Sequence, residues 1–505
     1  MNTTEHKRLK ENAAKDVPLE LWGPYVSDRQ WGTVREDYSE NGNAWDYFPH
    51  DHARSRAYLW GEDGLAGISD LYQNLCFSVA LWNGKDPILK ERLFGLSNGQ
   101  GNHGEDVKEL YYYLDNIPTH YYMKFLYKYP QAEYPYSELI NKNGSLGKDS
   151  PEFEILDTGI FNENKYFDVF VEYAKKNSED IYIKIEIINR GAAAAPLTVL
   201  PTLWLYNKWQ YEGELDKPSL DLVNNQCVQA VQRSLGNYYF YFPATDDLFF
   251  TENETNFEKL FGGENKTDFV KDAFHEALIS GKNIEGLKNK KQGTKFSPVY
   301  HLEVAPQASK IIYLRLCNER TDDAFPENFE NIFDKRIKEA DEFYEAMCKR
   351  NCNEDEKSIQ RQAFAGLLWS KQYYHYDVER WLSESDGITP ITEARKKGRN
   401  HSWKYLKNQD VMSMPDTWEY PWYAVWDTAF HCIALAVVDP VFAKHQLLLL
   451  MREWYMNPQG QLPAYEWDFS DVNPSVHAFA VYQVYLTEIK IYGEHDIEFL
   501  KRAFQ

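Results

Sequence analysis

The feature of the sequence that most limits its fold is a run of strict alternation, DIYIKIEIINRG, from Asp180 to Gly191. Isoleucine occupies every second position from residue 181 to residue 187, with Tyr182, Lys184 and Glu186 between. Because successive side chains of a β-strand point to opposite faces, this pattern predicts a strand with one buried and one polar face. Such strands are typical of antiparallel sheets that cover a hydrophobic core.

Similar segments flank this run and are separated by Asn, Gly and Pro. YFDVFVEYA begins at Tyr166, and the later segments are PLTVLPTLWLYNKW, NYYFYF, DDLFF, VYHLEVAP and SKIIYLRL. Many short strands with few helical patterns between them predict a large antiparallel β-sandwich. We assign this domain to residues 22–320, after a polar leader of residues 1–21.

The hydrophobic period changes after the last of these strands. In RIKEADEFYEAMCK, from Arg336 to Lys349, apolar residues recur at helical spacing. We therefore predict a helical linker over residues 321–354 and expect the rest of the chain, residues 355–505, to stay helical.

Capping residues predict several helix ends in this second region. Asp439-Pro440 and Asn473-Pro474 open helices, Gly493 ends one, and Asp496 caps the last. Each helix has an apolar face that a neighbour must bury, and a closed toroid needs more helices than these patterns supply. We expect the 505 residues to end within the second domain.

The second region contains the stretch WEYPWYAVWDTAFH, from Trp418 to His431, which places many aromatic residues around a single acid in its second half, Asp427. Aromatic faces beside one carboxylate are typical of a sugar pocket. A structural interpretation also stands. Trp418, Trp422 and Trp426 recur at i, i+4 and i+8 as in a buried stripe, although Pro421 breaks a continuous helix, and an Asp at a helix start is often a cap.

Hydrolysis of a glycosidic bond with inversion needs two carboxyl groups about 6.5–9.5 Å apart, one as acid and one as base. Asp427 is the candidate acid. Desolvation by the surrounding rings would raise its pKa, whereas a position at a helix start would lower it. The sequence does not decide whether the pKa of Asp427 is raised or lowered.

A second group of candidates lies in GQLPAYEWDFSDVNP, from Gly460 to Pro474. This loop between two predicted helices offers Glu466 as an acceptor for sugar hydroxyls, with Trp467 beside it. A surface salt bridge at Glu466 is the alternative.

Other chemistries find little support. The formal net charge of -22 disfavours nucleic acid and anionic membranes as partners, and no stretch approaches the ~20 apolar residues of a membrane span. His50, Asp51 and His52 are adjacent, so neighbouring side chains point to opposite faces of a strand and no further ligand at metal spacing completes a site. The glycine-rich loop near Gly99 has no phosphate-binding signature. We therefore expect neither a metal nor an organic cofactor.

The six cysteines are scattered and the N-terminus has no apolar leader. We interpret the cysteines as reduced, mostly buried thiols and expect a cytoplasmic protein.

Seven segments together are similar to a known family: RQWGTVREDYS, YFPHDHARSRAYLWGEDG, ERLFGLSNGQGNHGEDVKE, YMKFLYKYPQ, LPTLWLYNKW, NQDVMSMPDTWEYPWYAVWDTAFH and REWYMNPQGQLPAYEWDFSDVNP. They resemble the bacterial glucosidase-type proteins of glycoside hydrolase family 63. That group is related to processing α-glucosidase I and to mannosylglycerate hydrolase. The resemblance covers nearly the whole chain.

The resemblance implies an N-terminal β-sandwich followed by an (α/α)6 toroid, and exo-hydrolysis of an α-linked sugar with inversion. It matches the acid to Asp427 and the pocket loop to Pro463 and Glu466, and it implies a general base in helices beyond residue 505. Predicted substrate-binding residues are Trp418, Trp422, Trp426, Phe430, Glu466 and Trp467. The expected partner is an oligosaccharide or small glycoside. Two alternatives stay open, a sugar phosphorylase on the same architecture and a carbohydrate-binding protein without catalysis.

Overall fold

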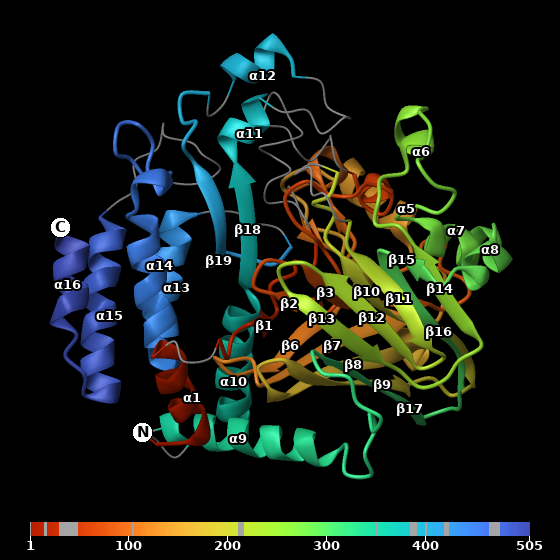
Figure 1. Cartoon of the computed structure of the whole chain (residues 1–505), viewed down its shortest axis with the longest axis horizontal. Coiled ribbons are helices and arrows are strands. Elements are labelled where there is room, and N and C mark those ends of the chain that lie inside the picture. Colours follow the sequence, from red (N-terminus) through yellow and green to blue (C-terminus); the bar gives the residue numbers. More distant parts are fainter. Residues whose placement is uncertain are drawn as a thin grey trace.

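The structure is a computed structural model. It describes residues 2–14, 18–29, 49–103, 106–210, 217–348, 352–383, 391–398, 401–418, 424–463 and 475–505. The two large sheets fill one half of the molecule and the C-terminal helices lie in the other half, on the same side as helix α1 (Thr4–Ala13) (Figure 1). The structure thus confirms β-sheets followed by helices. The closed toroid and the domain boundaries stay predictions.

Two large antiparallel sheets form the β half. The six-stranded sheet has the order β1 (Trp22–Gly23), β2 (Ile68–Asp70), β3 (Leu75–Trp82), β10 (Ala195–Leu205), β16 (Lys295–Val304), β14 (Asp247–Thr251). The nine-stranded sheet has the order β15 (Gln292–Gly293), β11 (Ser219–Asn224), β12 (Cys227–Gln232), β13 (Gly236–Tyr241), β17 (Ser309–Cys317), β9 (Asp180–Asn189), β8 (Tyr166–Asn177), β7 (Tyr122–Pro130), β6 (Tyr111–Asn116).

One hydrophobic core joins the two sheets. Phe77 of β3 lies 5.7 Å from Phe240 of β13 and 6.1 Å from Tyr173 of β8, measured between ring centroids. The four alternating isoleucines of β9, from Ile181 to Ile187, are at most 1% exposed, as the alternation predicts. The side chains between them are Tyr182, which is buried, and Lys184 and Glu186, which are partly exposed, because α9 covers part of that face.

Short elements connect or flank the sheets. These are α4 (His50–Ala53), β4 (Gly95–Leu96) paired with β5 (Asp106–Val107), α5 (Tyr136–Ser145), α6 (Phe257–Phe261), α7 (Ala273–Ser280), α8 (Ile284–Asn289), and the 3₁₀ helices η1 (Asn98–Gln100), η2 (Ile155–Thr158) and η3 (Asn162–Asn164). The glycine-rich segment thus contributes to η1.

Helices α9 (Asn331–Met347) and α10 (Glu354–Trp369) attach the C-terminal half to the nine-stranded sheet. Trp369 of α10 stacks on Tyr113 of β6, with ring centroids 5.3 Å apart. The predicted leader contains a helix, α1 (Thr4–Ala13), which lies beside α9 (Figure 1). Buried ion pairs hold the two helices together, because Arg8 binds Glu339, which also binds Arg336.

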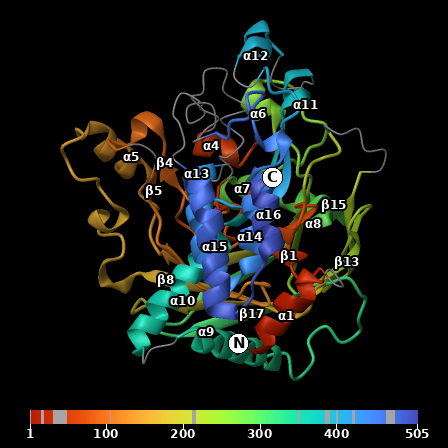
Figure 2. The ribbon, with the colours of Figure 1, turned by 90° about the vertical axis from the view of Figure 1, so that its left-hand side faces the viewer.

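Helices α13 (Val425–Val438), α14 (Pro440–Leu450), α15 (Val476–Tyr492) and α16 (Ile497–Phe504) pack side by side (Figures 1 and 2). The predicted caps are confirmed at three ends. Asp439 accepts from the Phe442 N–H at 3.0 Å, Asp496 accepts from the Phe499 N–H at 2.9 Å, and Gly493 ends α15 with a positive φ of 74°. The Asn473-Pro474 start lies outside the described residues.

The expectation of helix throughout residues 355–505 is wrong. β18 (Lys371–Asp377) and β19 (Lys407–Ser413) form an antiparallel pair, and only short elements, α11 (Val378–Ser383) and α12 (Glu393–Lys397), lie in the described part between them. The sequence KQYYHYD is rich in aromatic residues, which favour strands when they pack on a half-buried surface. One more 3₁₀ helix, η4 (Glu453–Tyr455), follows α14.

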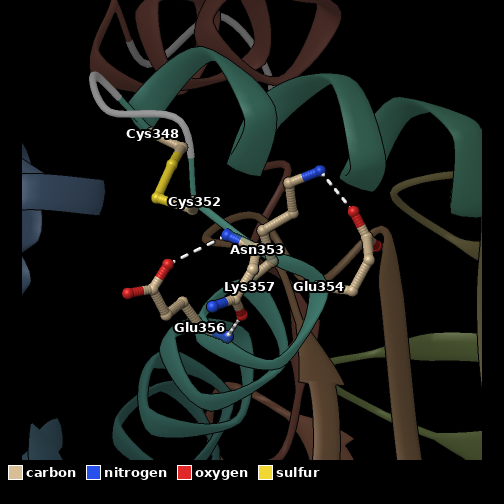
Figure 3. Close-up of a disulfide and its surroundings, with 6 residues drawn as sticks. All are labelled: Cys348, Cys352, Asn353, Glu354, Glu356 and Lys357. Atoms are coloured by element: carbon tan, nitrogen blue, oxygen red, sulfur yellow. Dashed lines mark hydrogen bonds and ion pairs between the residues drawn. A yellow bond between two sulfur atoms is a disulfide. The ribbon is translucent and has the colours of Figure 1, made fainter.

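The interpretation of all six cysteines as reduced thiols is also wrong. Cys348 and Cys352 form a disulfide in the turn between α9 and α10 (Figure 3). Met347 is the last residue of α9 and Asn353 is the N-cap of α10, so the two cysteines lie at the two ends of the short connection between these helices. The other four cysteines are buried and free. None of the described helices is long and apolar enough to cross a bilayer.

Candidate functional site

Asp427 occupies the first turn of α13, two residues after the helix begins at Val425. This confirms its predicted position at a helix start. The N-cap, Ala424, supplies no side-chain acceptor, and Ala424 and Val425 are both buried in a core that also contains Trp60 and Met412. The packing of these neighbours fixes the beginning of α13 and therefore the place of the Asp427 carboxyl.

The pKa of Asp427 is raised above its ordinary value, because partial burial disfavours the charged carboxylate. A hydrogen bond from its own backbone N–H opposes this and lowers the pKa, in the direction expected at a helix N-terminus. The effect of burial is the larger of the two. The pKa shift of Asp427, whose direction the sequence left open, is therefore upward, as a proton donor needs near neutral pH.

Two aromatic rings on α13 flank this carboxyl in sequence and remain half exposed. Trp426 is 47% exposed and Phe430 is 50% exposed, and their rings meet edge to face at 6.2 Å between centroids. The C-terminal end of the aromatic stretch thus presents a solvent-accessible pair of rings. Their predicted contact with a sugar stays a prediction.

Trp418 has a different environment from Trp426, since it is fully buried in the core shared by the two sheets. It fits there because position 95 is a glycine. A Cβ at Gly95 would overlap the Trp418 ring and crowd the backbone oxygen of Asp106. The structure gives Trp418 a packing role in this core, and its predicted substrate contact stays untested.

A buried carboxyl from the N-terminal segment anchors the residue before Trp418. The Thr417 hydroxyl donates to Asp28 Oδ2 at 2.8 Å, the Tyr113 hydroxyl donates to the same oxygen, and the Asp28 N–H donates to the Thr417 carbonyl at 3.2 Å. Burial raises the pKa of Asp28 to about 7. Sequence reasoning did not select Asp28, because the partners that give it importance are distant in the chain.

Residues of α13 anchor the C-terminal end of the aromatic stretch. The Thr428 hydroxyl donates to the carbonyls of Ala424 and Ser413, at 2.7 and 3.2 Å. His431, one helical turn after Asp427, lies 3.0 Å from the Ser413 hydroxyl through Nδ1. Burial lowers the pKa of His431 to about 4, so this imidazole is neutral near pH 7. His431 ends the aromatic stretch, but no sequence signal gave it a role.

Several predicted site residues fall outside the described residues, namely Trp422, Glu466 and Trp467. Pro463, which the resemblance pairs with Glu466, is buried. The structure therefore brings together Asp427, Trp426 and Phe430 on one helix start and leaves the other contacts as predictions.

Within the described residues, one group of three carboxylates has the spacing of a metal site, Asp106, Glu152 and Glu154. All three bind the ammonium of Lys108, at 2.6 Å from Glu152 and 2.9 Å from Glu154. A lysine thus already supplies the positive charge that these acids need. His50 and His52 lie on the short helix α4, where burial lowers the pKa of both.

The chemistry that this arrangement offers is proton donation. A carboxyl with a raised pKa lies on the same helix as two half-exposed rings, and hydrogen bonds and packing hold this helix to the rest of the molecule. An acid of this kind can protonate a leaving oxygen, while flat apolar rings suit the faces of a sugar.

No family model matches the chain. It is 45% identical, over 551 residues that include the whole chain, to the uncharacterized protein YMR196W of Saccharomyces cerevisiae. The alignment covers 51% of that protein, so the chain spans about half the length of this curated relative.

Comparison with solved structures gives weak likenesses. A putative kojibiose phosphorylase from the human microbiome matches at 10% identity and a TM-score of 0.24, over 89% of this chain and 54% of the phosphorylase. A family GH92 α-mannosidase of Bacteroides thetaiotaomicron matches at 10% identity and a TM-score of 0.23, over 95% of this chain and 64% of the mannosidase. TM-scores this low leave the fold unassigned.

Proposed function

We propose that this chain belongs to an exo-acting, inverting glycoside hydrolase that cleaves terminal α-linked glucose, or a related α-glycoside, from an oligosaccharide or small glycoside. The observation that carries the proposal is the Asp427 carboxyl, whose pKa is raised by burial beside the half-exposed rings of Trp426 and Phe430. The resemblance to glycoside hydrolase family 63 supports the same assignment.

In the proposed reaction, protonated Asp427 donates its proton to the glycosidic oxygen as the bond to the anomeric carbon breaks. A second carboxylate takes a proton from water, and that water attacks the opposite face of the sugar. Trp426 and Phe430 lie against the sugar face, and Trp418, Trp422, Glu466 and Trp467 complete the proposed pocket. The second carboxylate is proposed from the resemblance alone.

The proposal includes the architecture that the resemblance implies. Residues 22–320 form a β-sandwich domain, residues 321–354 a helical linker, and residues 355–505 the first part of an (α/α)6 catalytic domain. It also includes a cytoplasmic location.

The test uses the full-length protein with a panel of α-glucosides and α-mannosides. We expect release of the terminal sugar, with the β-anomer appearing first in ¹H NMR spectra recorded before mutarotation. Release of the α-anomer would exclude inversion. Phosphate-dependent formation of a sugar 1-phosphate would assign a phosphorylase instead, and sugar binding without turnover would assign a carbohydrate-binding protein.

The role of Asp427 is tested by Asp427→Asn, which keeps the size of the side chain and removes the proton. We expect a loss of kcat of about 10²- to 10⁴-fold with little change in sugar affinity. Glu498→Gln is the matched control, because Glu498 is also a carboxylate in the first turn of a helix, α16, but is 72% exposed. Near-normal turnover of Asp427→Asn would remove Asp427 from the mechanism.

A further inference from the structure

A cavity lies between the β half and the C-terminal half, and Asp427 is not among its lining residues. It has a volume of about 200 Å³. Its walls come from the N-terminal segment, the turn after β2, the β18–β19 pair and α14, and they include Glu20, Tyr72, Lys371, Gln409, Asp410 and Phe442. Residues distant in the chain thus converge on one small pocket.

The innermost charged group of this cavity is Lys371, whose side chain is only 1% exposed. Its ammonium lies 2.9 Å from Asp439 Oδ2 and 3.6 Å from Glu20 Oε1, and 4.1 Å from the centre of the Phe442 ring. These contacts fix Lys371 in place. The carboxylate of Glu20 is itself 23% exposed and can accept a hydrogen bond from a ligand.

Tyr72 supplies an aromatic wall and is held there by a rigid turn. The Asp70 carboxylate accepts the Tyr72 N–H at 3.1 Å and the Leu75 N–H at 2.9 Å, and the Lys208 ammonium donates to the Tyr72 carbonyl at 3.1 Å. The turn residues on either side are largely buried, yet Tyr72 remains 50% exposed. A large ring that a fixed backbone keeps in solvent is preorganised for a ligand.

The rim of the cavity adds further polar side chains. Gln409 and His445 are exposed, and Asp410 accepts from the Tyr455 hydroxyl at 2.7 Å through one carboxylate oxygen. Glu20 and Asp410 line the cavity, Asp439 lies behind Lys371, and Lys371 is the only lysine or arginine among the lining residues. This excess of negative charge disfavours phosphates and other anions.

We propose that this cavity binds a neutral polyhydroxy molecule of the size of one sugar ring. A volume of about 200 Å³ is enough to admit a single pyranose ring. Carboxylates and an amide beside two partly exposed rings, Tyr72 and Phe442, match a ligand with hydroxyls at its edge and apolar faces. The site is separate from Asp427 and does not depend on the proposed hydrolysis.

Binding is measured by isothermal titration calorimetry and saturation-transfer NMR with D-glucose, D-mannose and myo-inositol. We expect one of these to bind saturably at millimolar concentrations. Tyr72→Ala and Gln409→Ala each weaken that binding at least tenfold. Tyr112→Ala is the matched control, because Tyr112 is 39% exposed on β6 and does not line the cavity. All three positions are exposed, and circular dichroism checks that the variants fold.

Three outcomes would overturn the proposal. The first is no saturable binding of any of the three probes to the wild-type protein. The second is binding that Trp426→Ala abolishes and Tyr72→Ala leaves unchanged, which would place the sugar on α13. The third is tighter, Tyr72-dependent binding of spermidine or of glucose 6-phosphate, which would make the cavity a site for cations or for phosphates.

Discussion

At the scale of single residues, Trp418 and Gly95 fit together as a pair. The indole fills the space that a side chain at position 95 would take, and Arg29 lies over the same ring at 5.8 Å. Aromatic residues of one stretch thus differ in environment, because Trp418 is fully buried while Trp426 is half exposed. The spacing of the tryptophans allowed either result, since it says nothing about which neighbours from the sheets would cover each ring.

Gly95→Ala tests this pair. A methyl group would meet both the indole and the Asp106 carbonyl, so we expect the free energy of unfolding to fall by about 1–3 kcal/mol through overpacking. Urea unfolding followed by tryptophan fluorescence measures the loss. Gly99→Ala is the control, because a Cβ there meets no atom within 4 Å. Equal stability of the two variants would contradict close packing at Gly95.

Among the helices and strands, the predictions that depend on only a few neighbouring residues are confirmed. Asp439 and Asp496 cap their helices, and β9 buries its isoleucines, because capping and alternation act within a few residues. The sequence did not predict the β18–β19 pair, because its two strands are separated by some thirty residues. The helical pattern of α10, which ends just before β18, also favoured a continuing helix. The disulfide was missed for a related reason, since it depends on where α9 ends.

The α9–α10 turn gives a prediction at this scale. The disulfide closes a loop of five residues, Cys348 to Cys352, and loop closure this short is worth about 2 kcal/mol. We expect Cys352→Ser to lower the free energy of unfolding by up to that amount. The capping box of Asn353 and Glu356 retains the start of α10 (Figure 3).

Thiol counting decides whether the disulfide forms in cells. When cells are lysed directly into denaturant with excess iodoacetamide, the protein should carry four alkylated cysteines, and reduction should then release two further thiols. Six alkylated cysteines before reduction would contradict the bond and agree with the proposed cytoplasmic location, where thiols are kept reduced.

At the scale of the whole molecule, buried polar contacts join parts that are distant in sequence. Asp28 links the N-terminal segment to β6 and to Thr417, and Lys371 links Asp439 to Glu20. Contacts of this kind have no signature in a single sequence, because each partner looks like an ordinary polar residue. The same limit applies to the candidate site, where the sequence located Asp427 but not Asp28 or His431.

The Asp28 contact makes stability depend on pH. Its pKa is about 7 in the folded protein and near 3.8 when unfolded, so the folded state holds a proton that the unfolded state loses. The contribution of this group is fully present below pH 4 and is lost as the pH rises through 7. The carboxyl is buried, so the loss between pH 5 and 7 is about 2–3 kcal/mol.

Asp28→Asn removes this titration while keeping an acceptor for Thr417 and Tyr113. We expect the stability of the variant relative to wild type to increase from pH 5 to pH 8, measured by urea unfolding at each pH. Taking the difference between the two proteins cancels the titration of other buried groups such as Glu62. A constant difference across this range would show that Asp28 is ionised in the folded protein.

Helix α1 has a consequence for how the chain is made. Glu339, which binds Arg8 of this helix, lies 331 residues later in the chain, and Tyr492, whose ring meets that of His6, is synthesised later still. A helix of ten residues is marginal in water without tertiary contacts. Helix α1 is therefore synthesised long before the residues that hold it, and it can complete its packing only after they have been made.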